Sequence, residues 1–216
     1  IAITSDHGEA FGEYGFWEHR SCYRNISHLP LILNGSSIPK KNLTAYTQNI
    51  DVMPTLLDLA GLDIPEGLSG KSMLPLLKGR QEEFRDKVLV SSDHGAIQRM
   101  FVENDYALVH TLERGAWDHV EEYELFDLSK DPHQVNDIST GEEPRASEMR
   151  LKLRDWLAET LGDHPDPLEL SHLRGSRMWT DYAPKHLDQE EFNNLLENYP
   201  EIKRSYETDF IYEKDD

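Results

Sequence analysis

Short apolar runs alternate with longer polar stretches in the amino-terminal part of the chain. Residues 1–4 and 29–33 are mostly aliphatic, which predicts two buried strands that flank a long loop. Residues 51–61 carry apolar side chains at helical spacing and end at a glycine, so they predict a helix with one face on the core. Asp51 is expected to cap the amino end of this helix. A shorter helix is expected around residues 73–78.

The pattern changes after the charged segment 80–87, which marks a boundary between two structural units. Four short strand-like runs follow, and their close spacing predicts an antiparallel sheet built of hairpins. Residues 149–161 then place apolar side chains on one helical face and stop at Gly162. We therefore expect a small antiparallel sheet with one helix packed on it. The four runs are residues 88–92, 99–103, 106–110 and 122–128.

Composition limits the classes of partner. The chain has 216 residues and a formal net charge of −19, which argues against binding nucleic acid or an anionic membrane through its overall field. No apolar run approaches the length that a membrane span needs. The single cysteine excludes an internal disulfide framework, so the fold does not depend on an oxidising compartment.

Candidate chemistry follows the first predicted strand directly. Ser5, Asp6, His7 and Gly8 come immediately after it, at the edge of an α/β sheet where ligands bind. Asp and His are both metal ligands, and a glycine lets the backbone turn away sharply. This tetrapeptide by itself is equally compatible with a solvated polar turn.

Three blocks of sequence occur in a recognisable order and cover about residues 1–160. The first is the Ser-Asp-His-Gly-Glu run at 5–9 with its glycine-rich loop and following strand. The second is the Asn-Ile-Asp-Val-Met-Pro-Thr-Leu-Leu-Asp-Leu-Ala-Gly run at 49–61, and the third is Glu-Leu-Phe-Asp-Leu at 124–128, followed by Asp131 and Pro132. Together they resemble the sulfatase family of the alkaline phosphatase superfamily.

The resemblance implies an α/β fold, with part of an alkaline-phosphatase-like mixed sheet flanked by helices, then a small antiparallel sheet with one packed helix. Residues 1–80 would be the carboxyl-terminal part of the catalytic domain and residues 81–162 the small subdomain. Residues 163–216 would form an acidic extension. The implied activity is metal-dependent hydrolysis of sulfate esters, acting on a sulfated small molecule or glycan.

Sulfatases of this kind attack with a formylglycine made from a Cys/Ser-x-Pro-x-Arg motif, and this motif is absent here. The only cysteine, Cys22, lacks the proline and the correctly placed arginine. We therefore expect the chain to be a carboxyl-terminal fragment, with the formylglycine in the missing upstream part. By itself it should be inactive.

The resemblance also assigns roles to residues of the first block. Asp6 and His7 are expected to bind a divalent metal, for which an oxygen-rich site favours Ca²⁺, while the imidazole is compatible with Mn²⁺ or Zn²⁺. His19 is expected to contact the sulfate and to protonate the leaving oxygen, since an imidazole titrates near neutral pH. Arg20 could clamp an oxyanion, or simply cap the loop. Glu9 could orient His7.

His94 lies in a Ser-Asp-His-Gly run that repeats the first motif. We interpret the repeat as chance, although His94 could contact the leaving group of the substrate, because in sulfatases this subdomain lines the substrate entrance. Trp17, Arg99 and Trp117 are weaker candidates for the same role. Two alternatives to a sulfatase stay open: a phosphonate or phosphate ester hydrolase of the same superfamily, and a non-catalytic truncated product.

Overall fold

The structure is a computed structural model. It describes residues 1–174 except 81–83, and five single residues after them. Most of the expected acidic extension, residues 163–216, lies outside this part. The division of the chain into three segments therefore stays a prediction. The described residues are 1–80, 84–174, 188, 190, 193, 194 and 197.

The amino-terminal unit contains the two predicted strands. Strand β1 (Ala2–Thr4) pairs antiparallel with β4 (Leu31–Leu33), and Ile3 lies opposite Ile32. Helix α2 (Val52–Leu59) and the short helix α3 (Leu74–Leu77) lie beside this pair, as the helical spacing predicted. Buried side chains of α3 pack with those of β4, so the unit has a small core of its own.

Asp51 occupies the N-cap position of helix α2, as expected, but its side chain makes no capping hydrogen bond to that helix. It ends the 3₁₀ turn η2 (Asn49–Asp51), and its fully buried carboxylate accepts hydrogen bonds from the backbone N–H groups of Gln48 and Lys71, both at 2.9 Å. The Arg85 guanidinium forms an ion pair with the same carboxylate. Because a buried charge is stable only when it is paired and hydrogen-bonded, Asp51 links η2 to the segment that leads into the next sheet.

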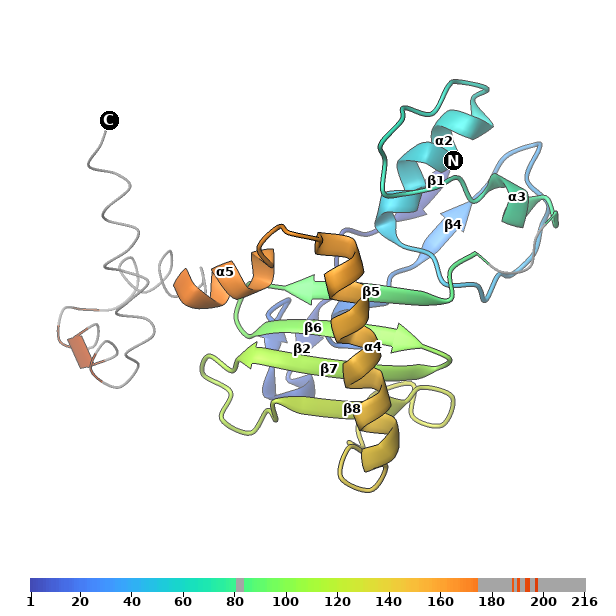
Figure 1. Cartoon of the computed structure of the whole chain (residues 1–216). Helices are drawn as coiled ribbons and strands as arrows, with labels where there is room; N and C mark the ends of the chain where they lie inside the picture. The colour runs from blue at the N-terminus through green and yellow to red at the C-terminus, as the bar shows by residue number, and fades with distance from the viewer. Residues whose placement is uncertain (81–83, 175–187, 189, 191–192, 195–196, 198–216) are drawn as a thin grey trace.

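A four-stranded antiparallel sheet forms the second unit, in the order β5-β6-β7-β8. All four predicted strands are present; the first three are one to three residues longer than expected, and the fourth is one residue shorter at each end. Helix α4 covers one face of the sheet (Figure 1). It begins six residues earlier than the apolar pattern indicated, because polar residues with a proline in the first turn continue the helix. The bounds are Lys87–Ser92 for β5, Ile97–Glu103 for β6, Tyr106–Glu113 for β7, Tyr123–Asp127 for β8 and Glu143–Leu161 for α4.

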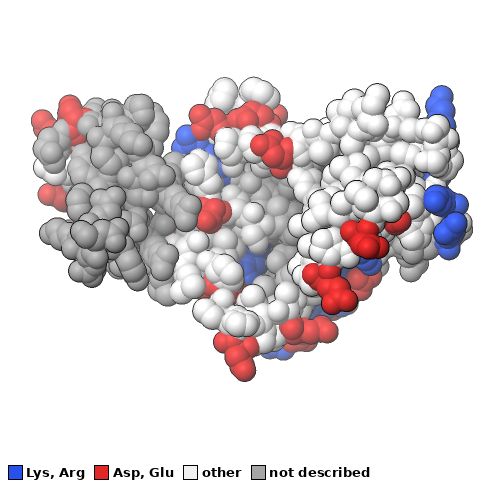
Figure 2. All heavy atoms as spheres, turned by 90° about the horizontal axis from the view of Figure 1, so that it is seen from above, with Lys and Arg blue, Asp and Glu red and all other residues white. Residues whose placement is uncertain are grey.

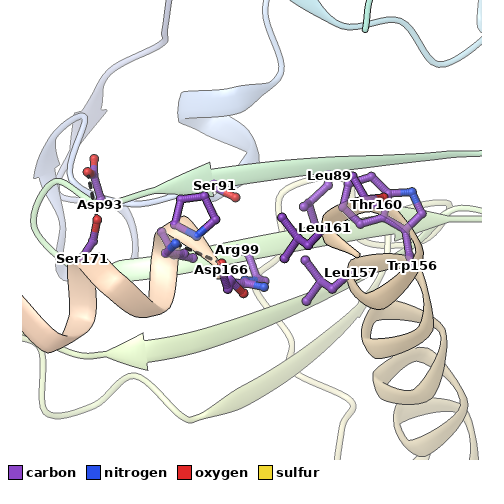
Figure 3. A pocket seen from close by; sticks show the side chains of 12 residues that line it. Leu89, Ser91, Asp93, Arg99, Trp156, Leu157, Thr160, Leu161, Asp166 and Ser171 are labelled. Atoms are coloured by element: carbon purple, nitrogen blue, oxygen red, sulfur yellow. Dashed lines mark hydrogen bonds and ion pairs between the residues drawn. The ribbon is translucent and has the colours of Figure 1, made fainter. Parts of the chain in front are cut away.

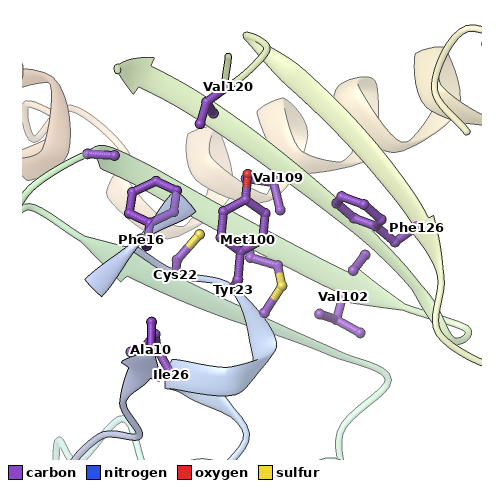
Figure 4. Close-up of a cluster of buried hydrophobic side chains, with 12 residues drawn as sticks. Ala10, Phe16, Cys22, Tyr23, Ile26, Met100, Val102, Val109, Val120 and Phe126 are labelled. Atoms are coloured by element: carbon purple, nitrogen blue, oxygen red, sulfur yellow. The ribbon is translucent and has the colours of Figure 1, made fainter. Parts of the chain in front are cut away.

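The opposite face of the sheet is covered by the loop that leads from β1 to β4. This loop forms a hairpin of β2 (Ala10–Phe11) and β3 (Trp17–Glu18), followed by helix α1 (Arg24–Ser27). Phe16, Cys22, Tyr23 and Ile26 of the loop are buried against Met100, Val109 and Phe126 of the sheet (Figure 4). The long polar loop of the sequence is therefore a packed layer, which holds the amino-terminal motif beside the second unit.

Helix α5 (Pro167–Arg174) lies against β6 and β7. None of the helices in the described residues combines the length and apolar character needed to cross a membrane. On the face that Figure 2 shows, acidic side chains are spread over the surface, while Lys and Arg gather mainly toward one end. Over the described residues of that face there is no continuous basic patch, consistent with the net charge of −19.

Candidate active site

The Ser-Asp-His-Gly motif forms a compact turn at the carboxyl end of β1. The Ser5 hydroxyl donates to the His7 carbonyl oxygen at 2.7 Å, and the His7 backbone N–H donates to Asp6 Oδ1 at 2.9 Å. The Gly8 N–H donates to the Ile26 carbonyl oxygen at 2.7 Å, which fastens the turn to helix α1. A Cβ at Gly8 would lie 2.1 Å from the Asn25 carbonyl oxygen, so only glycine fits there.

These hydrogen bonds leave one free atom on each of the two predicted metal ligands. His7 Nδ1 donates to the Gly8 carbonyl oxygen at 2.8 Å, a bond that leaves the Nε2 lone pair available. His7 Nε2 lies 3.8 Å from Asp6 Oδ2. Two ligands that each bind one ion at ~2.0–2.6 Å are separated by roughly 3–4 Å, so these two atoms fit a shared cation.

The groups around the Asp6 carboxyl favour its ionised form, which is the form that binds a metal. Its pKa is lowered, first by the hydrogen bond from the His7 backbone N–H and further by the charge of the His7 ring. Asp6 therefore stays ionised well into the acidic range, as a metal ligand must. From the amino end of η2, Asn49 Nδ2 donates to the carbonyl oxygens of Ser5 and Asp6, both at 3.4 Å. Asn49 begins the second of the three sequence blocks, but no role at the site was predicted for it.

Three histidines from three separate segments form a stack. The His7 and His19 rings lie with their centroids 4.0 Å apart at 27°, and the His19 and His94 rings lie 5.6 Å apart at 17°. His7 follows β1, His19 follows β3, and His94 lies in the turn between β5 and β6. This histidine stack of His7, His19 and His94 brings together the amino-terminal motif, the loop and the antiparallel sheet.

Glu9 also belongs to this group, although not in the expected way. Its Oε2 lies 3.6 Å from His19 Nδ1, whereas the sequence suggested that it orients His7. Ligand atoms of His7, Glu9 and His19 all lie within 4.8 Å of one another, a spacing that could hold a metal ion. His19 Nδ1 is buried and has no hydrogen-bond partner among the described residues, so this donor set fits a cation or an anionic substrate.

The turn that carries His94 is locked to the loop. Gly95 has φ of +90°, and a Cβ on it would lie 2.7 Å from the Arg20 carbonyl oxygen. The Ala96 N–H donates to that same oxygen at 3.1 Å. Burial, together with the charges of Arg20 and His19, lowers the pKa of His94 and favours its neutral form. The repeated motif thus places a second histidine after a strand end, close to the first.

Arg20 points to a neighbour in its own loop. Its Nε donates to Glu18 Oε2 at 2.7 Å, and this bond is the main reason why the pKa of Glu18 is lowered. The ion pair supports the loop-capping interpretation. A role of Arg20 in substrate binding stays a prediction.

Two other candidates, Arg99 and Trp117, make contacts with residues outside the stack. Arg99 is on the opposite face of the sheet from Gln98, whose side chain accepts a hydrogen bond from the Cys22 N–H. Trp117 stacks on Phe16 with centroids 4.4 Å apart, which makes it part of the core. Burial raises the pKa of the Cys22 thiol, and this residue is only 1% exposed, so it cannot serve as a nucleophile.

Trp17, the remaining candidate, is exposed and lies across the β2–β3 hairpin from Phe11. It is two residues from His19 in the sequence. Of the weaker candidates for substrate contact, Trp17 is the one that the structure leaves accessible near the stack.

Comparisons with known proteins agree with this geometry. Residues 12–162 match the family described as N-sulphoglucosamine sulphohydrolase, C-terminal. Arylsulfatase K of Xenopus laevis is 29% identical over 162 residues, covering 71% of this chain and 30% of that protein. N-acetylglucosamine-6-O-sulfatase of Bacteroides thetaiotaomicron is 26% identical over 190 residues, covering 82% of this chain and 33% of that protein.

Among solved structures, a 2-O GAG sulfatase superposes with a TM-score of 0.64 at 26% identity, covering 76% of this chain and 37% of that one. The alkaline-phosphatase-like fold expected from the motifs is therefore confirmed. The chain spans about a third of the length of the curated relatives that it matches, 30% and 33% for the two named above.

Proposed function

Because the chain belongs to the family of N-sulphoglucosamine sulphohydrolase carboxyl-terminal regions, we propose that it supplies part of the active site of a sulfatase. The reaction would be hydrolysis of a sulfate ester, with a sulfated glycan or small molecule as substrate. The observation that carries the proposal is the histidine stack beside Asp6 at the end of β1. Resemblance of sequence alone would not require His94 to lie next to His19.

Asp6 and His7 would hold a divalent cation through the two atoms that their hydrogen bonds leave free. When bound, such an ion supplies Lewis-acid stabilisation of the charge on the sulfate oxygens. Carboxylate oxygens favour Ca²⁺, and the imidazole is compatible with Mn²⁺ or Zn²⁺. The metal's identity is thus a matter for measurement.

His19 would do the proton transfer. It lies between His7 and His94, with Glu9 Oε2 3.6 Å from its Nδ1. An imidazole in this position can bind a sulfate oxygen and give a proton to the leaving alcohol. Neutral His94 would accept or donate one hydrogen bond to the part of the substrate beyond the sulfate.

The nucleophile of this reaction would have to come from polypeptide that is not in this sequence. The chain contains no Cys/Ser-x-Pro-x-Arg motif, and its one thiol is buried in the core. We propose a formylglycine for this role, as the resemblance to sulfatases implies. The residues described above would then form one wall of the active site.

The metal proposal can be tested on the chain itself. Titration with Mn²⁺ should broaden the imidazole NMR signals of His7 and His19, because the ion is paramagnetic and would lie beside both rings. Asp6→Asn removes one charged ligand and should weaken this effect by at least about tenfold, roughly the loss from one charge-assisted contact. Asp118→Asn, an exposed change in the loop between β7 and β8, is the control. Equal broadening in the two variants would reduce Asp6 to a turn residue.

The class of substrate needs the enzyme that contains this chain together with its nucleophile. Its kcat/KM should be higher for a sulfate monoester than for a phosphonate monoester with the same leaving group. The opposite order would favour the phosphonate hydrolase alternative. Absence of any turnover with both esters, despite bound metal and an intact nucleophile, would contradict an enzymatic role.

A further inference from the structure

A pocket lies on the face of the antiparallel sheet that helix α4 covers, and no residue of the histidine stack lines it. It has a volume of about 370 Å³ and opens between β5, the carboxyl end of α4 and the start of α5 (Figure 3). A volume of this size is at the lower end of the usual range for small-molecule sites. We call it the α4–α5 pocket, and Arg99, Asp166, Trp156 and Leu157 are among its lining residues.

Arg99 is the unusual group in this pocket. Its side chain is only 3% exposed, and one guanidinium nitrogen forms an ion pair with Asp166 at 2.7 Å. Arg99 Nε is buried and has no hydrogen-bond partner among the described residues. A buried donor without an acceptor costs free energy, so this N–H calls for an oxygen atom inside the pocket.

The lining combines an apolar wall with polar groups. Leu157, Leu161 and Trp156 of α4 stand on one side, and Ser91, Asp93 and Thr160 add hydroxyl and carboxylate oxygens. The formal charges are those of one arginine and two aspartates, which sum to −1. An anion is therefore disfavoured, and an amphipathic neutral molecule with several hydroxyl groups matches the surface best.

We propose that the α4–α5 pocket binds a neutral, unsulfated pyranose ring. One ring face would pack on the apolar wall at Trp156, an oxygen of the sugar would accept the Arg99 Nε hydrogen bond, and hydroxyl groups would donate to Asp93. The choice of a carbohydrate rests on the proposed function, whereas the need for a neutral ligand with an acceptor rests on the pocket alone.

The test is an NMR titration of the isotopically labelled 216-residue chain with N-acetylglucosamine, which is neutral and carries both hydroxyls and an amide carbonyl. We expect saturable shift changes at the methyl groups of Leu157 and Leu161 and at the Trp156 indole. The rings of His7 and His19, which do not line the pocket, should not respond. Since this measurement needs no turnover, its outcome is independent of whether the enzyme proves to be a sulfatase.

Two variants make the test specific. Ser91→Phe adds bulk to the pocket from an exposed position on the edge strand and should weaken binding by at least about tenfold. Ser37→Phe, equally exposed but outside the pocket, should bind like the parent chain. Arg99→Lys keeps a cation for Asp166 but removes the Nε donor, and a loss of about fivefold to tenfold is expected.

Absence of saturable shifts at the solubility limit of the sugar would overturn the proposal. So would unchanged binding in Ser91→Phe, or tighter binding of N-acetylglucosamine 6-sulfate than of the neutral sugar at the same residues.

Discussion

His19 is the central residue of the histidine stack, and its neighbours come from the turn after β1 and from the turn between β5 and β6. It lies between two imidazoles, and a carboxylate lies close to its Nδ1. Such a setting suits a group that must bind an anion and pass a proton to a leaving oxygen. A loop histidine without this role would not need a buried, unpartnered ring nitrogen.

In the proposed enzyme, His19→Ala should lower kcat by roughly 10²–10⁴-fold, the usual range for general acid–base catalysis. The loss should be smallest for an activated phenol and largest for an alkyl or sugar sulfate, because only a poor leaving group needs the proton. His19→Lys should restore part of the activity, since an ammonium can also bind the anion and donate.

His164→Ala, an exposed change outside the stack, should leave kcat unchanged. A uniform loss of only a few-fold for all leaving groups in His19→Ala would remove the acid role.

For single residues, the sequence predicted those positions that depend only on neighbouring residues in the chain. Asp6 and His7 follow a strand and precede a glycine, so their place at a sheet edge could be read directly. The position of Glu9 beside His19 depends on how the loop between β1 and β4 folds, and nothing local specifies that. His94 is 75 positions from His19, and only the packing of the β5–β6 turn on Arg20 brings them together.

Among the connections between elements, the β5–β6 turn leaves no room for a side chain at Gly95. Gly95→Ala should destabilise the chain by roughly 2–4 kcal/mol, because a positive φ and a clash act together. The added Cβ would lie 2.5 Å from Arg20 Cβ and 2.7 Å from the Arg20 carbonyl oxygen. Chemical denaturation measures the change.

Gly162→Ala is the matched control, since Gly162 also has a positive φ, of +55°, but nothing within 4 Å of a Cβ. It should cost only about 1 kcal/mol. Equal losses in the two variants would mean that contact with Arg20 does not constrain the turn.

The loop between β1 and β4 contacts β8 through an ionisable side chain, Glu124. The Tyr23 hydroxyl donates to Glu124 Oε2, and burial raises the pKa of Glu124 from 4.5 to about 6. The folded state therefore holds the proton more tightly than the unfolded chain, and stability declines as pH rises from about 4.5 through about 6. Above that window the buried carboxylate remains a cost.

Glu124→Gln keeps an acceptor for Tyr23 but removes this charge. At pH ~8 its free energy of unfolding should exceed that of the parent by about 1 kcal/mol, and near pH ~4 the two should agree. Urea denaturation at both pH values measures this, with the exposed Glu122→Gln as control. A Glu124→Gln chain that is less stable at the higher pH would contradict the assignment.

The elements themselves were largely predictable. Apolar spacing located both amino-terminal strands, α2, the four-stranded sheet and the carboxyl-terminal turns of α4. The first turns of α4 could not be found in this way, because polar residues occupy them and helix propensity alone extends the helix. The hairpin of β2 and β3 was missed because two-residue strands leave no periodic pattern.

For the whole molecule, we expect the lack of a Cys/Ser-x-Pro-x-Arg motif to abolish activity, whatever the residues of the candidate site contribute. We expect the purified 216-residue chain to hydrolyse no aryl sulfate, with Ca²⁺ or with Mn²⁺ added. The measurement is release of a chromogenic phenol by homogeneous protein, with an active sulfatase assayed in parallel. Robust metal-dependent turnover would show that the chain carries a nucleophile that its sequence does not reveal.

Because Cys22 is buried, the rate at which its thiol is chemically labelled reports local opening of the structure. The thiol lies between the loop layer and the sheet, and it is the only one in the chain. An alkylating reagent can reach it only while these two layers are apart. The rate of labelling therefore measures how often the loop separates from the sheet. The same interface holds His19 beside His94, so labelling of Cys22 also reports the opening of the candidate site.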